Sequence, residues 1–378
     1  MKTKIFSAFF ILFLCLAAVG AVNAFEDTYG DLTYKYNGSG KTITIIACNK
    51  SAADVVIPSE IDGKAVTSIR RFAFDGCTNL TSVTIPDSVT SIGWNAFRGC
   101  TNLDRVDITD IAAWCKIDFS NDGVTNPLYY AHNLYLNGEL VENLVIPDGI
   151  THVNDVFRGC SSIRSVTIPD SVTSIGASAF EGCTGLANVT IGNSVTSIGD
   201  DAFRGCSSFV SIIIPDSVTS IGDHAFWECS KLNKVTIGSG VTFIGDWAFA
   251  NCDRPMRVNI TDIAAWCEIS LGDYRSTPFS YCILNINGAL VENHVIPDGV
   301  TCIGDTVFVG CQSLRQVTIP DSVTSIGDHA FSGCHNLRRV TIPDSVTSIE
   351  EYAFGSCAGT SVTIGNCITK LGKYALIH

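Results

Sequence analysis

Apolar and polar residues alternate in short stretches that recur along most of the chain, and segment 80–100 is representative. Val83 and Ile85 alternate there with Ser82 and Thr84. This period of two predicts a short strand with the two apolar side chains facing inward and the two polar ones facing solvent.

The rest of the segment predicts the return path of one coil. Pro86-Asp87 ends the strand, because proline has no backbone donor and aspartate suits a turn. Val89 and Ile92 form a second inward pair, Ala96-Phe97 fill the far side of the core, and Gly99-Cys100 closes the turn. We therefore expect each copy to form one turn whose apolar face is covered only by its neighbours.

The copies recur every 23 residues, and this fixed period predicts a solenoid. Each copy carries Ile-Pro-Asp-Ser-Val-Thr-Ser-Ile-Gly or a variant of it, followed by a Phe-x-x-Cys motif. Two intervals between motif cysteines are much longer than the rest, from Cys100 to Cys160 and from Cys252 to Cys311. The motif cysteines, which we call the thiol ladder, are Cys77, Cys100, Cys160, Cys183, Cys206, Cys229, Cys252, Cys311, Cys334 and Cys357.

The two longer intervals are copies of one another, and we interpret them as inserted turns near residues 106–146 and 258–296. In the first copy three apolar residues at helical spacing predict a short helix over 110–116 with its tryptophan buried. Asn137-Gly138 and Asn287-Gly288 are typical of tight hairpin turns, so each insert is expected to carry a protruding hairpin. The matching segments are residues 108–115 and 260–267, and residues 136–143 and 286–293.

The N-terminal segment that precedes Ile57 differs from the repeats. Residues 1–24 have a basic start, an apolar core too short to cross a bilayer and a small-residue end, which is the layout of a secretory signal peptide. Residues 25–56 alternate β-formers around Asn37-Gly38-Ser39-Gly40, and they predict an N-terminal β-hairpin cap on the solenoid of residues 57–378. We expect export without membrane insertion after the leader is cleaved. No evident cap or anchor precedes His378, so the mode of attachment stays open.

The repeat Ile-Pro-Asp-Ser-Val-Thr-Ser-Ile-Gly-x-x-Ala-Phe-x-Gly-Cys-x-x-Leu-x-x-Val-Thr resembles the BspA-type leucine-rich repeat, over roughly residues 31–378. The Ile-Thr-Asp-Ile-Ala-Ala-Trp-Cys insert also resembles members of that family. The resemblance implies a leucine-rich-repeat solenoid of about a dozen turns, β-rich, with short parallel strands and short helical or irregular convex segments. Family members with an assigned role are mostly surface adhesins, and that role is carried by no residue motif, so the resemblance assigns no binding residue.

Sixteen cysteines remain after the leader, and two fates are open to the thiol ladder. Neighbouring turns lie about 5 Å apart, so disulfides between them are possible in distance. However, equivalent thiols project in parallel, whereas a disulfide needs converging Cβ vectors. We expect buried free thiols that fill the core, with a disulfide stack as the alternative. Off the ladder lie Cys48, Cys115, Cys267, Cys282, Cys302 and Cys367.

The chain lacks the motifs of metal sites and catalysis, so we expect no cofactor, no metal and no enzyme activity. It has no Cys-x-x-Cys, His-Glu-x-x-His or Gly-x-Ser-x-Gly motif. A row of turn aspartates offers one carboxylate per turn, which favours capping of each turn's own backbone over calcium binding. The slot before Ala-Phe accepts such different side chains that we expect it to be exposed; it holds Asn95, Ser178, His224, Trp247 and His329.

Composition excludes a disordered chain, since 46% of the residues are hydrophobic and 16% charged. The net charge of −13, or −15 without the two leader lysines, argues against nucleic-acid binding. Four of nine solvent-facing strand positions are nevertheless basic. This strip suggests an acidic partner or a sulfated glycan, unless the side chains only solvate an open sheet. The basic strip consists of Arg105, Lys234, Arg257 and Arg339.

We therefore expect an exported, non-enzymatic adhesin, secreted or held at the cell surface, that binds an extracellular protein such as a matrix or host-surface protein. The alternative is a glycan-binding module. Sugars usually stack on exposed aromatic rings, whereas Trp114 and Trp266 are expected to be buried and Trp94, Trp227 and Trp247 occupy unrelated slots. The pattern therefore favours a protein partner.

Overall fold

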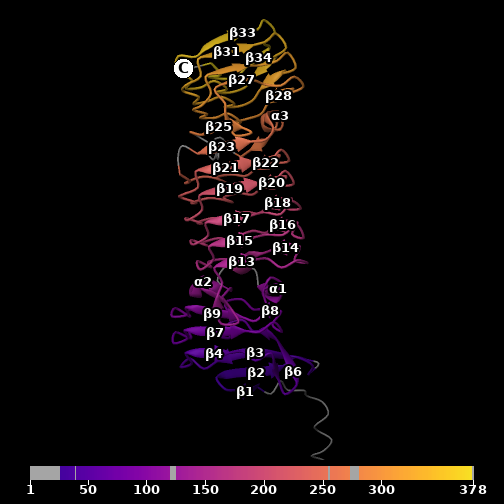
Figure 1. Cartoon of the computed structure of the whole chain (residues 1–378), viewed down its shortest axis with the longest axis vertical. Coiled ribbons are helices and arrows are strands. Elements are labelled where there is room, and N and C mark those ends of the chain that lie inside the picture. The colour runs from indigo at the N-terminus through magenta and orange to yellow at the C-terminus, as the bar shows by residue number, and fades with distance from the viewer. Residues whose placement is uncertain (1–25, 39, 120–124, 254–255, 273–280, 377–378) are drawn as a thin grey trace, which may run out of the picture. The chain divides into compact units, whose positions relative to one another are not determined.

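A computed structural model of the chain shows short strands stacked rung upon rung (Figure 1). The chain divides between Pro127 and Leu128 into two compact units. The predicted leader, residues 1–24, lies outside the described residues. The structure describes residues 26–38, 40–119, 125–253, 256–272 and 281–376.

The N-terminal unit begins with an antiparallel hairpin layer that passes into a parallel stack. Strands β1, β2 and β3 pair antiparallel, and β3 then pairs parallel with β6, which continues through β8 to β10. A second parallel ladder joins β4, β7 and β9. The elements are β1 (Glu26–Tyr29), β2 (Leu32–Tyr36), β3 (Ile43–Cys48), β4 (Asp54–Val56), β5 (Glu60–Ile61), β6 (Lys64–Ile69), β7 (Ser82–Ile85), β8 (Ser91–Ile92), β9 (Arg105–Ile108), α1 (Ile111–Trp114) and β10 (Asp118–Phe119).

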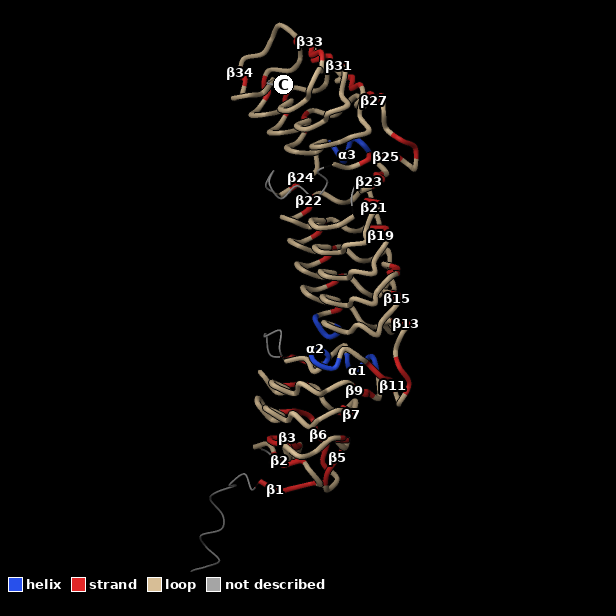
Figure 2. Tube along the Cα trace, turned by 90° about the vertical axis from the view of Figure 1, so that its left-hand side faces the viewer, coloured by secondary structure: helices blue, strands red, loops and turns tan. Residues whose placement is uncertain are grey.

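The C-terminal unit has two columns of parallel strands, one of three- and four-residue strands and one of two-residue strands (Figures 1 and 2). The longer strands are β13 (Asn143–Val145), β15 (Ser165–Thr167), β17 (Asn188–Thr190), β19 (Ser211–Ile214), β21 (Lys234–Ile237), β23 (Arg257–Ile260), β25 (Ile283–Ile286), β27 (Asn293–Val295), β29 (Gln316–Thr318), β31 (Arg339–Ile342) and β33 (Ser361–Ile364). The two-residue column consists of β14 (His152–Val153), β16 (Ser174–Ile175), β18 (Ser197–Ile198), β20 (Ser220–Ile221), β22 (Phe243–Ile244), β24 (Ser270–Leu271), β28 (Cys302–Ile303), β30 (Ser325–Ile326), β32 (Ser348–Ile349) and β34 (Lys370–Leu371).

The inserts form the predicted helices and hairpins. In the second insert, α3 (Ile263–Cys267) repeats α1 of the first, and each helix is N-capped by an aspartate side chain. The hairpins join β11 (Leu134–Leu136) to β12 (Glu139–Leu140) and β25 to β26 (Ala289–Leu290). Both residues of each Asn-Gly pair have positive φ, as a type I′ turn requires. Two further helices are α2 (Leu128–Ala131) and the 3₁₀ helix Asp155–Phe157.

The core of each turn is made by the residues that the apolar pattern predicts. Val83, Ile85, Val89, Ile92 and Phe97 are all buried. Phenylalanines of successive turns stack with nearly parallel rings, with centroids 4.7–5.6 Å apart. Each turn therefore buries its apolar residues against the turn before and the turn after, as in other solenoids. The predicted solenoid is confirmed.

The slot before Ala-Phe differs from the prediction, because it is mostly half-buried and its backbone is left-handed. Its φ values lie between 51° and 61°, although none of its residues is glycine. The conformation lets the slot's N–H donate to a carbonyl of the next turn, as in His224 to Asp246 at 2.8 Å and His329 to Glu351 at 2.9 Å. That bond offsets the backbone cost. The residues of this left-handed slot are Phe72, Asn95, Ser178, Asp201, His224, Trp247, Thr306, His329, Tyr352 and Tyr374.

Candidate binding surface

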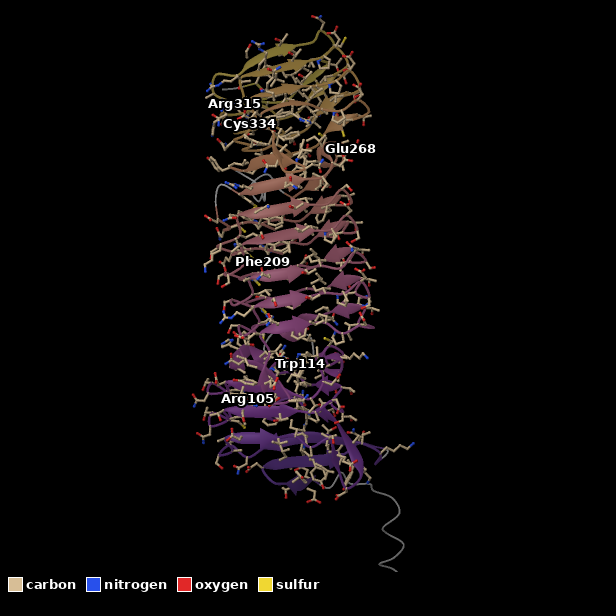
Figure 3. All side chains as sticks on the ribbon, in the orientation of Figure 1. Arg105, Trp114, Phe209, Glu268, Arg315 and Cys334 are labelled. Carbon is tan, nitrogen blue, oxygen red and sulfur yellow. The ribbon has the colours of Figure 1, made fainter. Side chains whose placement is uncertain are left out.

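The structure brings together two of the four residues of the basic strip. Lys234 on β21 and Arg257 on β23 are register partners on neighbouring strands, and both side chains are exposed. Arg339 is also exposed, but it lies on β31, in another sheet of the same unit. Arg105, on β9 of the N-terminal unit, is half-buried (Figure 3).

Arg105 is also neutralised, which the sequence pattern did not indicate. Its guanidinium contacts the carboxylate of Asp107 at 2.6 Å. The two residues are two apart on one strand, so their side chains share a face. In contrast, no ion pair within the described part of the chain engages Lys234 or Arg257. Lys234 and Arg257 therefore remain the candidate recognition charges.

A groove of about 630 Å³ opens where the strand column is interrupted, and its lining includes Ser211, the register partner of Lys234, but neither Lys234 nor Arg257. Strands β17 and β19 follow one another in the column, yet no strand pairing or backbone hydrogen bond of the described residues joins them. Exposed aliphatic side chains border the gap, with Val210 48% and Ile213 68% exposed. The groove is lined by Asn188, Val189, Thr190, Ile191, Asn193, Ser211, Ile213, Ile214, Pro215, Asp216, Ser217, Thr236, Gly238 and Thr261.

We interpret the interruption as an effect of Phe209, which is fully buried (Figure 3). It occupies the position that Leu186 and Leu232 hold in the flanking repeats. Its ring lies 6.0 Å from Phe203 and 6.3 Å from Phe226, so three aromatic rings share the space of two rings and a leucine. A larger side chain in a packed core displaces the backbone around it.

Three of the turn aspartates, Asp170, Asp216 and Asp344, cap the backbone of the following turn rather than their own, which corrects the expectation for them. Asp216 accepts hydrogen bonds from the N–H and the hydroxyl of Ser239 at 2.7 and 3.2 Å. Asp170 accepts from the N–H of Asn193 at 2.6 Å. The carboxylates therefore tie successive turns together. Among the described residues, no group of three His, Cys, Asp or Glu is placed to hold a metal ion.

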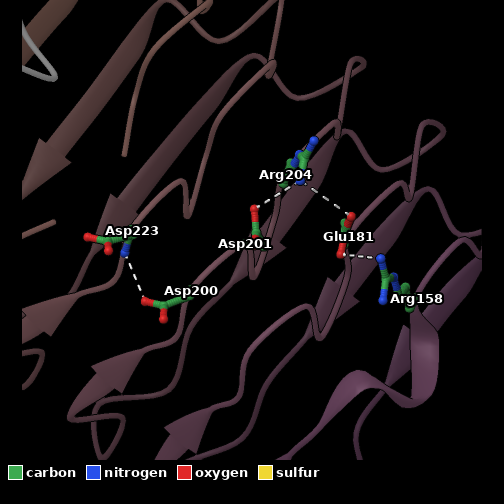
Figure 4. A network of polar contacts seen from close by, with 6 residues as sticks. All are labelled: Arg158, Glu181, Asp200, Asp201, Arg204 and Asp223. Atoms are coloured by element: carbon green, nitrogen blue, oxygen red, sulfur yellow. Dashed lines mark hydrogen bonds and ion pairs between the residues drawn. The ribbon is translucent and has the colours of Figure 1, made fainter. Parts of the chain in front are cut away.

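A second charged row lies on the return segments and is internally paired (Figure 4). Glu181 contacts Arg158 at 3.0 Å and Arg204 at 3.9 Å, and Arg204 contacts Asp201 at 3.5 Å. Burial, followed by the nearby Glu181 charge, raises the pKa of Asp201. Asp200 caps the N–H of Asp223 at 2.9 Å in the adjacent row. These charged side chains bind one another, mostly between successive turns. Their opposite charges largely cancel, so the row offers a ligand little net electrostatic attraction.

A second cavity, of about 600 Å³, combines carboxylates with aromatic rings. It is lined by Asp305, Asp328 and Glu351 and by the left-handed residues His329 and Tyr352, among others. The two rings are 5.0 Å apart. The alternation of apolar and polar residues does not predict this cavity. Two of its lining residues, His329 and Tyr352, have positive φ, and the residue types His and Tyr do not indicate that conformation.

The fold and its repeats define a leucine-rich-repeat solenoid. The chain belongs to the family of the BspA type leucine rich repeat region, whose profile matches residues 48–121, 131–261 and 287–378 in six copies. A comparison with curated protein sequences gave no match. No helix in the described residues is both long enough and apolar enough to span a bilayer.

Solved structures of bacterial leucine-rich proteins resemble the chain along most of its length. One from Bacteroides ovatus is 21% identical, with 93% of each chain covered and a TM-score of 0.54. A leucine rich cell surface protein from Faecalibacterium prausnitzii is 28% identical, with 90% of this chain and 95% of that one covered and a TM-score of 0.47. The pneumococcal vaccine antigen PcpA is 17% identical, with 93% and 78% covered and a TM-score of 0.40.

Proposed function

We propose that the protein is exported, acts at the cell surface or after secretion, and binds an extracellular protein without catalysing a reaction. The leader-like residues 1–24 and the BspA-type family support export. The groove between β17 and β19 carries the binding proposal. Exposed aliphatic side chains and two strand edges without a described partner meet there, and Lys234 and Arg257 lie on the next two strands of the same sheet.

The surface around the groove favours an acidic protein segment with apolar side chains. No carboxylate among the described residues pairs with Lys234 or Arg257, and in a chain of net charge −13 these two cations form a local exception to its field. Ile213 and Val210 offer apolar area next to them. Strand edges that lack a partner also supply backbone donors and acceptors to an extended peptide.

The test is a comparison of variants binding to immobilised extracellular-matrix proteins, starting with acidic ones. We expect Lys234→Ser with Arg257→Ser, and separately Ile213→Ser, to weaken binding at least about tenfold with unchanged melting curves. Arg339→Ser is the matched control, because it removes another exposed cation from a different sheet. Equal binding by the groove variants and the wild type would reject the groove as the site.

Glycan binding is the second candidate function, and the observation that favours it is the exposure of two aromatic rings. Trp94 and Trp247 are 42% and 44% exposed, and both are bulky rings on the return segments. Trp247→Ala is expected to reduce binding to a sulfated polysaccharide such as heparin only if this second function is correct. Loss of heparin binding with intact protein binding would separate the two activities.

A further inference from the structure

The thiol ladder is held by a repeated hydrogen bond. In each regular turn the Sγ–H of the ladder cysteine donates to the carbonyl of the phenylalanine 26 residues earlier, in the preceding turn. The same carbonyl also accepts from the N–H of its own turn's cysteine, as at Phe74. Cys334 is one example in Figure 3. The Sγ–O distances are 3.1 Å for Cys100, 3.2 Å for Cys183 and Cys206, 3.1 Å for Cys229, 3.3 Å for Cys252, and 3.0 Å for Cys334 and Cys357.

Three ladder cysteines begin a run of repeats and have no such phenylalanine before them. They are Cys77, Cys160 and Cys311, which follow the N-terminal cap, the first insert and the second insert. Two of these three positions have another cysteine upstream at the same spacing, Cys48 before Cys77 and Cys282 before Cys311. The first insert has His132 where the second has Cys282.

Each upstream cysteine lies against its ladder partner. The Sγ of Cys77 lies 3.9 Å from the carbonyl oxygen of Cys48. The N–H of Gln312, the residue after Cys311, donates to the carbonyl oxygen of Cys282 at 2.8 Å, so the two cysteines lie on adjacent segments. All four residues are buried. Because the upstream cysteines do not occupy the ladder position, the parallel projection that disfavours bonding between ladder rungs does not apply to these pairs.

The contacts also make one thiol of each pair easier to ionise. The hydrogen bond from Cys48 lowers the pKa of Cys77, and the hydrogen bond from Cys282 lowers the pKa of Cys311 to about 7. In the middle of the ladder, desolvation raises the pKa of Cys183, Cys206 and Cys229. Since the thiolate is the reacting species in disulfide formation, Cys77 and Cys311 are the thiols of the two pairs that react first.

We propose that Cys48–Cys77 and Cys282–Cys311 are disulfide sites that close on export, while the other ladder thiols stay reduced. The oxidant is the disulfide of an extracytoplasmic thiol oxidoreductase. The ladder thiolate attacks one of its sulfurs and forms a mixed disulfide, which releases the oxidant's other sulfur as a thiolate. The thiolate of the upstream cysteine then attacks the ladder sulfur of the mixed disulfide, forms the Cys–Cys bond and releases the second thiolate of the oxidant. The oxidant leaves as a dithiol that carries the two electrons and two protons. The two bonds staple a non-repeat element to the first repeat after it.

The decisive measurement is peptide mapping of the secreted full-length protein, alkylated under denaturing conditions without reductant. We expect twelve of the sixteen described cysteines to be alkylated, with two cross-linked peptide pairs. Cys48→Ser and Cys282→Ser should each abolish one cross-link and raise the alkylated count by one. Cys206→Ser is the matched control and should leave both cross-links in place.

Stability provides the second readout. Reductant is expected to lower the melting temperature of the wild type and of Cys206→Ser, but not of the double variant Cys48→Ser with Cys282→Ser. Sixteen alkylated thiols after export, or bonds between ladder neighbours such as Cys183–Cys206, would overturn the proposal.

Discussion

At one inward position of the longer strands, a single side chain changes the burial of the site and its sensitivity to pH. The middle residue of β13 is Leu144, and the equivalent residue of β27 is His294. The leucine is fully buried, whereas the histidine is half-buried and no described residue gives its Nε2 a hydrogen bond. Burial lowers the pKa of His294 below its ordinary value. The histidine is therefore a polar exception in an otherwise apolar column.

Replacing His294 by Leu should stabilise the protein and reduce its acid sensitivity. The unfolded state binds the proton more tightly than the folded state, so the stability is complete above the unfolded pKa of about 6.5 and declines as the pH falls below it. Urea unfolding of His294→Leu and wild type at about pH 7.5 and about pH 5 should show a difference that widens in acid. Leu144→His is the matched reciprocal change and should add acid sensitivity. Parallel pH profiles would contradict the assignment.

Phe203→Ala removes one ring from the continuous phenylalanine stack. Phe203 lies 5.4 Å from Phe180 and 5.3 Å from Phe226 and is fully buried. Because neighbouring turns hold the cavity open, the expected loss is about 3–5 kcal/mol in the free energy of unfolding. Ser211→Ala, at an exposed strand position in the next repeat, should change it by less than about 0.5 kcal/mol. A loss under about 1 kcal/mol for Phe203→Ala would show that the ring is dispensable.

At the scale of elements, the sequence predicts the strands, which follow from the apolar–polar periodicity, and the tight turns, which follow from the residue types. The alternation around Val83 places strand β7, and the Asn-Gly pairs place both hairpins. It does not predict the left-handed slot, since Thr306 is a poor candidate for positive φ and is held there by the hydrogen bond of its N–H to the carbonyl of Asp328 in the next turn. Nor does it predict the gap beside β19, which depends on how Phe209 packs between turns.

The helix caps of the two inserts give a test at this scale. Asp110 accepts from the N–H of Ala113 at 2.6 Å, and Asp262 accepts from those of Ala264 and Ala265 at 2.7 and 3.2 Å. Asp110→Ala and Asp262→Ala should each lower the free energy of unfolding by about 1 kcal/mol in denaturant melts. Asparagine also caps well, so the two Asp→Asn variants should lose much less. Equal losses for alanine and asparagine would mean that charge, rather than capping, matters.

At the scale of the whole molecule, the chain is acidic and several of its cations are held in local ion pairs. Arg98, Arg105, Arg158 and Arg204 all contact carboxylates. The net charge of −13 then acts against acidic partners unless unpaired cations are gathered in one place. Lys234 and Arg257 meet that condition, because they are register partners on neighbouring strands. The four residues of the basic strip taken together do not, because they are spread over separate sheets.

The salt dependence of binding separates these two views of the surface. If all four residues of the strip contribute, changing Arg105, Lys234, Arg257 and Arg339 to serine should weaken binding far more than changing Lys234 and Arg257 alone. We expect the two variants to bind alike, because Arg105 is already neutralised and Arg339 lies in another sheet. Exposed charges are screened over about 8 Å at physiological salt, so wild-type affinity should also fall as salt rises, and both variants should lose that slope. A further loss of about tenfold in the quadruple variant would restore the strip as a single site.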